Sequence, residues 1–158
     1  MQQLEIPMRE FQYQSKQDVI DAAALFIHEM FQRDSYSFTS CYQVKQYLMT
    51  KLSWKDNEVF AVLFLDSQHR LIKYKEMFYG TVDSAAVYPR EIVKAALSLN
   101  AAAVILAHNH PSGITTPSRA DIQITQRIKQ ALDIIDIRTL DHIIVGEDAH
   151  SFAECGDL

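Results

Sequence analysis

An apolar run that ends in a histidine-rich turn constrains the fold of this chain more than any other segment. Residues 101 to 107 are Ala-Ala-Ala-Val-Ile-Leu-Ala, and His108-Asn109-His110-Pro111-Ser112-Gly113 follows at once. The run shows no alternation of polar and apolar side chains, which is typical of a strand buried on both faces of a sheet. It is long enough for a strand and short for a helix. We therefore expect a central strand that delivers the histidine-rich turn to one end of the sheet.

Two histidines are expected to converge where this strand ends. If the strand continues into the turn, His108 and His110 project to the same side, because alternate residues of a strand share a face. Pro111 cannot donate to a ladder, and Gly113 permits backbone angles closed to other residues. The chain should therefore leave the sheet immediately after His110.

A helix start follows the loop and contributes a carboxylate. Ser118-Arg119-Ala120-Asp121 resembles a capping box with Asp in the place of Glu or Gln. Because the first turn of this helix can fold back toward the strand end, two imidazoles and one carboxylate suit a catalytic zinc with a fourth position for water. For Asp121 alone, the simpler interpretation is an acid that interacts with the helix dipole. The whole constellation favours a metal site.

The motif also resembles a known family, the JAMM or MPN-plus metalloproteases. Their pattern is a distant glutamate, then His-x-His-Pro, then Ser-x-x-Asp, and here it matches His108, His110, Pro111, Ser118 and Asp121. With residues 89–91 upstream and 140–146 downstream, the chain is similar to the RadC branch over about residues 37 to 158. The resemblance implies a zinc-dependent metallopeptidase or isopeptidase with one Zn²⁺ per chain. It also implies an α+β sandwich, a central mixed sheet flanked by helices, of the cytidine-deaminase-like JAB/MPN kind.

The resemblance requires a distant glutamate as general base, since zinc hydrolysis needs a group that moves the proton of water to the leaving group. In the family this glutamate opens an apolar strand. Glu58 matches, because the apolar run 59–65 follows it. Glu76 in the next predicted strand is the rival, and its simpler interpretation is a polar residue beside Lys73 and Lys75 on a solvated face. For Glu58 the simpler interpretation is an exposed charge at a strand start.

Other polar residues near the motif receive separate predictions. Ser118 is expected to cap its helix, and the resemblance adds a hydroxyl that hydrogen-bonds the reacting water or the developing oxyanion. Asn109 should point away from the ligands, and it stands where the deubiquitinating branch commonly has Ser or Thr. His142 is either a satisfied interior histidine or a partner of a ligand. The remaining histidines outside the predicted site are His28, His69 and His150.

The pattern along the chain predicts helices mixed with a central sheet. Helices are expected from about Ser15, Ser40 and Pro89, and from Ser118 to about Asp133 with Ile122, Ile128 and Leu132 inward. Strands are expected over 59–65, 71–78, 101–107 with its continuation into the histidine motif, 142–145 and 151–153.

The length of 158 residues fits one domain and an extension. We predict a helical extension over residues 1–36 and a JAB/MPN hydrolase domain over residues 37–158. The extension carries an apolar stripe at Ile20, Ala24 and Ile27. This stripe is expected to pack against the main domain or against a second subunit, so a homo-oligomer is one of two predicted arrangements.

Charge bears on partners. The formal net charge of −5 argues against a surface that neutralises the phosphates of duplex DNA. The alternative function, a DNA repair-associated accessory or DNA-processing protein, comes from the RadC resemblance. Longer RadC members carry a helix-hairpin-helix region, whereas the first glycine here is Gly80. We therefore expect a peptide or isopeptide substrate, and the charge disfavours a nucleic-acid partner without removing that alternative.

Location follows from what the sequence lacks. The apolar runs fall short of the roughly 20 residues that span a bilayer. The first residues lack the basic start and apolar core of a secretory signal. Cys41 and Cys155 form neither a disulfide framework nor a Cys-x-x-Cys pair. We expect a cytoplasmic protein with no membrane partner.

Overall fold

The central strand of the sheet is β3 (Ala103–Asn109), which contains most of the apolar run and the first histidine of the turn. In the computed structural model, which describes residues 15–33, 38, 40–80 and 86–158, every residue of β3 is buried. It lies between β1 (Val59–Leu65) and β4 (Arg138–Val145), so neighbours cover both of its edges. The predicted buried strand is confirmed, although it begins at Ala103 and not at Ala101.

The sheet is mixed, with the strand order β2-β1-β3-β4-β5. β1 is antiparallel both to β2 (Leu71–Tyr79) and to β3, β3 is parallel to β4, and β4 is antiparallel to β5 (Ala149–Ser151). A parallel pair needs a crossover, and α4 (Arg119–Asp133) supplies it between β3 and β4. The carboxyl ends of β3 and β4 therefore lie at the same edge of the sheet, next to the start of α4.

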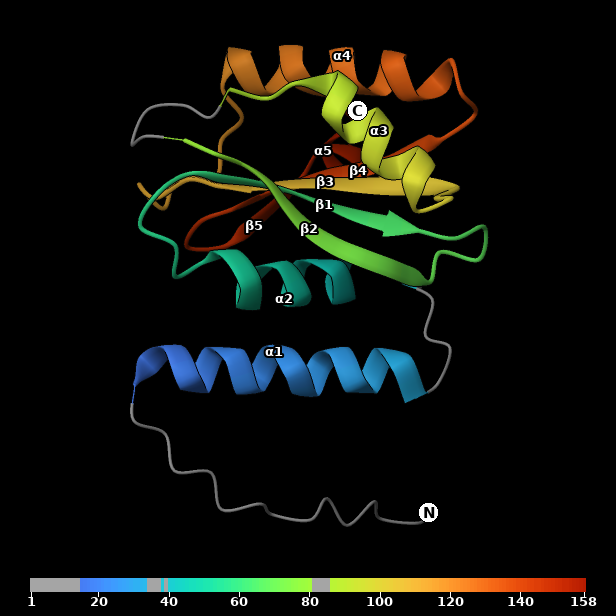
Figure 1. Cartoon of the computed structure of the whole chain (residues 1–158). Helices are drawn as coiled ribbons and strands as arrows, with labels where there is room; N and C mark the ends of the chain where they lie inside the picture. The colour runs from blue at the N-terminus through green and yellow to red at the C-terminus, as the bar shows by residue number, and fades with distance from the viewer. Residues whose placement is uncertain (1–14, 34–37, 39, 81–85) are drawn as a thin grey trace.

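Helices cover both faces of the sheet (Figure 1). α3 (Pro89–Ser98) and α4 lie on one face, and α2 (Cys41–Leu52) lies on the other. Along β3, Leu106 packs in the cluster under α3 and α4, whereas Ile105 packs in the cluster under α2. This alternation divides the core into two apolar layers. The predicted α+β sandwich with a central mixed sheet is confirmed.

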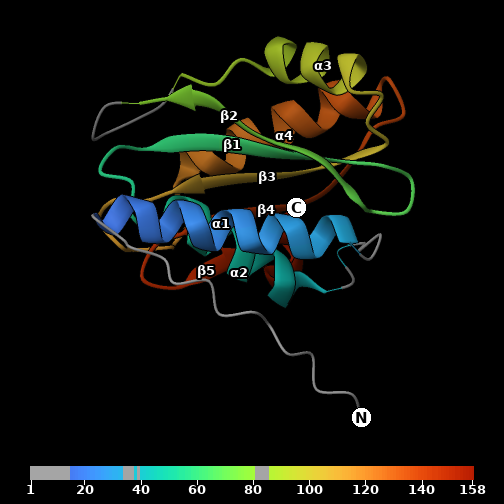
Figure 2. The same ribbon diagram turned by 60° about the horizontal axis from the view of Figure 1, so that its bottom comes forward.

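α1 (Lys16–Arg33) forms a further layer outside α2 (Figure 2). Ala24 is buried and Ile27 packs against the core cluster under α2, whereas Leu25 and Phe26 are exposed. The apolar stripe thus packs against the main domain, and a second subunit stays a prediction. The predicted boundary between residues 36 and 37 lies outside the described residues and also stays a prediction. Within the described ranges, none of the helices has the length and apolar character needed to cross a membrane.

Two local predictions are wrong. Ile122 is 41% exposed, because the capping of α4 turns Asp121 inward and the buried stripe continues through Thr125. The strand expected over 151–153 is instead the end of β5 followed by a short helix, α5 (Phe152–Cys155). The hydroxyl of Ser151 accepts a hydrogen bond from the Glu154 amide, which caps this helix and ends the strand.

The central position of β3 predicts an unequal response to two leucine truncations. Leu106→Ala should lower the free energy of unfolding by about 3 kcal/mol, because Leu106 is fully buried and truncation leaves a cavity. Leu97→Ala on the exposed side of α3 should change it by less than about 0.5 kcal/mol. Urea denaturation measures both, and equal losses would contradict the assigned core.

Candidate metal centre

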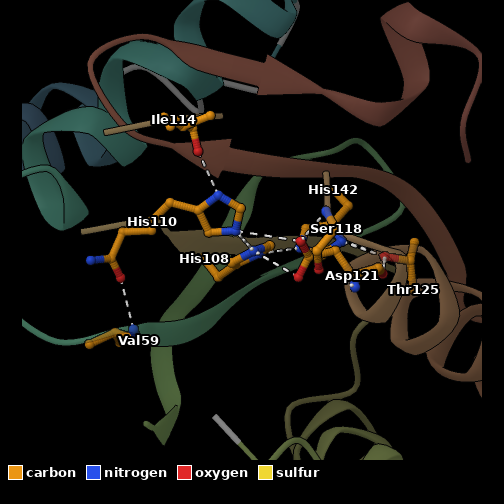
Figure 3. Close-up of polar contacts among 9 residues, drawn as sticks. Val59, His108, His110, Ile114, Ser118, Asp121, Thr125 and His142 are labelled. Carbon is orange, nitrogen blue, oxygen red and sulfur yellow. Dashed lines mark hydrogen bonds and ion pairs between the residues drawn. The ribbon is translucent and has the colours of Figure 1, made fainter. Parts of the chain in front are cut away.

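The end of β3 places two imidazoles side by side (Figure 3). His108 is 1% exposed and lies on the face of β3 that α4 covers, while His110 follows directly after the strand. The Nε2 atoms of the two rings are 2.9 Å apart. The expectation that both rings turn toward one point agrees with this geometry.

The first turn of α4 brings a carboxylate to the same point. Asp121 Oδ1 lies 3.1 Å from His108 Nε2, and Asp121 Oδ2 lies 3.4 Å from His110 Nε2. Ser118 and Asp121 form the predicted capping box, in which Ser118 Oγ accepts from the Asp121 amide and Asp121 Oδ2 accepts from the Ser118 amide. One carboxylate therefore fixes the start of the helix and faces both histidines.

The loop after β3 orients His110. Its Nδ1 donates to the carbonyl oxygen of Ile114 at 2.7 Å, so Nε2 is left to face Asp121. This loop lies against the turn after β4, where a Cβ on Gly146 would come within 2.3 Å of the Gly113 carbonyl oxygen. A side chain at position 146 would therefore push the loop away, and Gly113 itself has a positive φ of 83° that favours glycine.

A hydrogen-bond chain orients His108. Thr125 Oγ1 lies 2.6 Å from the carbonyl oxygen of Asp121, which can only accept, so the hydroxyl donates there. The same oxygen then accepts from His142 Nδ1 at 2.6 Å, which leaves His142 Nε2 to accept from His108 Nδ1 at 2.8 Å. We assign the tautomers on this basis. The lone pair of His108 Nε2 consequently faces His110 and Asp121.

Electrostatics agree with this assignment. Burial lowers the pKa of His142 well below its ordinary value, so this ring is neutral and can accept from His108. Burial opposes ionisation of Asp121, but its contacts with the His108 and His110 rings outweigh burial and hold the pKa of the carboxyl well below its usual range. The adjacent Asp121 carboxylate favours the protonated ring and raises the pKa of His110, although burial opposes this. The negative charge of Asp121 therefore lies beside the Nε2 atoms of His108 and His110.

The three groups fit one metal ion. His108, His110 and Asp121 each offer one ligand atom, and these atoms all lie within 4.8 Å of one another. Two ligands at 2.0–2.1 Å from one tetrahedral ion stand about 3.3 Å apart, close to the separations seen here. Two unprotonated nitrogens and a carboxylate repel one another unless a cation lies between them. Their arrangement suits a cation with two nitrogen ligands and one oxygen ligand.

Glu58 and Glu76 lie in different surroundings. Glu58 precedes β1 on the side of His108, since alternation places it on the face of Phe60. Burial raises the pKa of Glu58, and the charge of Asp121 adds to this shift, whereas His108 and His110 oppose it. The Glu58 carboxyl therefore senses all three members of the candidate site.

The Glu76 carboxylate is occupied elsewhere. It pairs in register with Ala61, which packs in the cluster under α2. It accepts hydrogen bonds from Lys55 Nζ at 3.1 Å, Tyr74 at 3.2 Å and Tyr79 at 3.1 Å. Glu76 thus lies on the face opposite to His108. The role of Glu58 as general base stays a prediction, but its rival is on the wrong side of the sheet for it.

Thr125 and His142 belong to the site although the sequence pattern left both outside the ligand set. Of the two interpretations of His142, the structure shows both at once: the side chain is fully buried and hydrogen-bonds His108. The available signal was a threonine one turn after Asp121 and a histidine opening an apolar strand. Neither spacing reveals a contact between α4 and β4. Asp141 contacts the site only through the backbone: it accepts a hydrogen bond from the His142 amide at 2.7 Å, and its other bonds are to Ser151 and the start of α5.

A polar cavity opens beside the candidate site. It has a volume of about 360 Å³ and lies at the carboxyl ends of the parallel strands β3 and β4. Ends of parallel strands are common positions for ligand pockets. The lining includes Asn109, His110, Ser112, Lys55 and Glu147.

The fold and the site define a class: an α+β domain of the JAB/MPN kind with a histidine, histidine and aspartate group at the end of its central strand. Residues 38–157 match the family described as "RadC-like JAB domain". The chain belongs to this RadC-like JAB family.

Relatives support the same membership. The chain is 57% identical over 135 residues to a UPF0758 protein of Marinomonas sp. (strain MWYL1), covering 85% of this chain and 60% of the relative. It is 54% identical over 140 residues to a UPF0758 protein of Vibrio cholerae, covering 89% of this chain and 88% of the relative. A third UPF0758 protein, from Saccharophagus degradans, is 60% identical over 76% of this chain and 54% of its own length. The chain thus spans little more than half of several relatives, and their shared name states no activity.

The hydrogen-bond chain predicts that Thr125 tunes metal affinity from outside the ligand set. Thr125→Val should weaken metal binding about 10-fold or more, because the tautomer and orientation of His108 lose their support. Thr50→Val is a matched control, since Thr50 also donates to a helix carbonyl, that of Gln46, but lies in α2. Competition with a chromophoric chelator measures both affinities. Equal metal affinities for the two variants would contradict a role of this hydrogen-bond chain in metal binding.

Proposed function

We propose that this chain is a zinc-dependent hydrolase of the JAMM class that cleaves peptide or isopeptide bonds. One Zn²⁺ per chain would be held by His108, His110 and Asp121. The observation that carries the proposal is the convergence of two imidazole lone pairs and a carboxylate on one point, with separate hydrogen bonds orienting each ring. Membership of the RadC-like JAB family supports it.

The ligand chemistry supports zinc. Two imidazoles and one carboxylate form a three-residue set of the kind seen in catalytic zinc sites, where a fourth position is left to water or substrate. Hard cations such as Mg²⁺ and Ca²⁺ prefer oxygen ligands. When bound, zinc would supply Lewis-acid chemistry, lowering the pKa of a water ligand from about 15.7 toward about 7 and polarising a carbonyl oxygen.

Glu58 is the proposed proton carrier. Burial raises the pKa of Glu58, and this direction suits a carboxylate that has to accept a proton. Glu58 would accept a proton from the attacking water and deliver it to the leaving nitrogen. The Ser118 hydroxyl would donate to the oxyanion that develops on the substrate carbonyl. It can do so while it caps α4, since its oxygen accepts from the Asp121 amide and its own proton remains free.

The setting of the reaction is also part of the proposal. The polar cavity beside His110 would accommodate part of the substrate, and a cytoplasmic location suits the two free cysteines, Cys41 and Cys155. The alternative role in DNA processing is not favoured by any observation in the described residues, and the net charge of −5 opposes phosphate binding.

The metal assignment predicts the zinc content of purified protein. The wild-type chain should contain about one zinc per chain, and His110→Ala should lose it, because two protein ligands hold the ion far less tightly than three. His69→Ala is the control: this residue lies between β1 and β2 and hydrogen-bonds Arg138, away from the site. Elemental analysis gives the readout. Full zinc occupancy in His110→Ala would contradict the assignment of His110 as a zinc ligand.

If Glu58 is the general base, its substitution should affect hydrolysis but not zinc binding. Glu58→Gln should keep zinc but slow hydrolysis about 100-fold or more, since the amide cannot accept the proton. Glu76→Gln should keep both zinc and activity. Cleavage of a mixed peptide library, followed by mass spectrometry, compares the variants. Loss of activity in Glu76→Gln with normal activity in Glu58→Gln would reverse the assignment.

A further inference from the structure

Asn109 stands between the two histidines of the candidate site, and its side chain serves a different segment. It is 2% exposed, and alternation along β3 directs it away from the face of His108. Asn109 Oδ1 accepts from the Val59 amide at 2.8 Å, a bond drawn in Figure 3. Its Nδ2 donates to the carbonyl oxygen of Asn57 at 3.0 Å and to that of Lys55 at 3.3 Å. One amide group thus binds the backbone on both sides of Glu58.

These bonds occur where the regular ladder between β1 and β3 ends. The last paired residues are Phe60 and His108, so the backbone before Phe60 has no β3 partner in that ladder. Asn109 supplies the missing partner. On the opposite side, the Glu58 carbonyl oxygen accepts from the Gly80 amide at 2.8 Å. The residue that precedes β1 is therefore clamped between the end of β3 and the end of β2.

We propose that Asn109 is a positioning residue that holds the Glu58 backbone in register with the metal ligands. This inference rests on the proposed function and names a further residue of the same site. The tripeptide His108-Asn109-His110 would then serve both parts of the reaction: the outer residues hold the metal and the middle one sets the distance to the base.

An amide suits this task better than other side chains of its size. The three backbone groups are one donor and two acceptors, and a single carboxamide satisfies all of them. A carboxylate would repel the two carbonyl oxygens, and a serine hydroxyl has one proton for two acceptors. Removing the Asn109 amide would leave the candidate metal ligands, the Glu58 carboxylate and the hydrogen-bond chain behind His108 unchanged. It would free only the backbone of residues 55–59.

The test uses the full chain with cobalt(II) in place of zinc. The visible absorption of the cobalt protein is recorded against pH. The pH at the midpoint of the absorption change responds to charges near the metal. Glu58→Gln should move the midpoint by about one pH unit, the effect of removing a nearby charge. Asn109→Ala should keep about one cobalt per chain and move the midpoint in the same direction by about half as much or more. Adding Asn109→Ala to Glu58→Gln should move it no further, since coupled residues are not additive.

Two controls separate positioning from damage to the fold. Asn100→Ala, at an exposed position after α3, should leave the midpoint at the wild-type value. Hydrogen exchange in Asn109→Ala should speed up at the Val59 amide and stay slow at Leu106. If Asn109→Ala does not fold, Asn109→Ser keeps an acceptor for Val59 without two donors, and its midpoint should shift toward that of Glu58→Gln.

The outcomes distinguish this inference from the function on which it rests. A wild-type chain that binds no cobalt overturns the proposed function, and the inference with it. A midpoint that Glu58→Gln moves but Asn109→Ala and Asn109→Ser leave unchanged overturns the inference alone. Additive shifts in the double variant would also overturn it, because Asn109 would then act independently of Glu58.

Discussion

The carboxylate of Asp121 is the interaction on which the rest of the site depends. It accepts a hydrogen bond from the Ser118 amide at the start of α4, and it faces Nε2 of both His108 and His110 at the end of β3. One side chain therefore belongs both to the cap of the helix and to the group of candidate metal ligands at the end of the strand. A shift of α4 along the sheet would therefore separate Asp121 from both histidines at once. This explains why an acidic residue occupies the first inward position of a helix whose buried side continues through Thr125 to the apolar Ile128 and Leu132.

Each group of the candidate site is oriented by a second partner on a different element. His110 donates to Ile114 in the loop, and His108 donates through His142 and Thr125 back to the carbonyl of Asp121. This series of hydrogen bonds begins at the Asp121 carbonyl and ends at His108, whose ring again faces the Asp121 side chain. Movement of one of these residues therefore displaces the others. Such outer partners fix the tautomer and the orientation of each ligand ring. The clamp of Asn109 on residues 55–59 extends the same arrangement to Glu58.

Much of the fold could be predicted because its signals are local. The buried strand β3 follows from an unbroken apolar run, and the start of α4 follows from Ser118 and Asp121. Predictions failed where tertiary contacts override local pattern. Ile122 has the spacing of an inward residue, yet the capping geometry rotates Asp121 and Thr125 inward instead. The segment after β5 has strand-like composition, yet the Ser151 cap and the buried ring of Phe152 make it a helix.

The sequence by itself determined the candidate ligands, since His108, His110 and Asp121 lie within one strand end, one loop and one helix turn whose geometry local rules predict. Only the tertiary structure distinguishes the surroundings of Glu58 from those of Glu76. Both are acids near predicted strands, and which of them meets His108 depends on a bulged register between β1 and β2 that sends Glu76 to the α2 face. The same holds for His142 and Asn109, whose partners are 34 and 50 residues away along the chain. Contacts across such separations depend on how the strands pair, which the pattern of one segment alone does not specify.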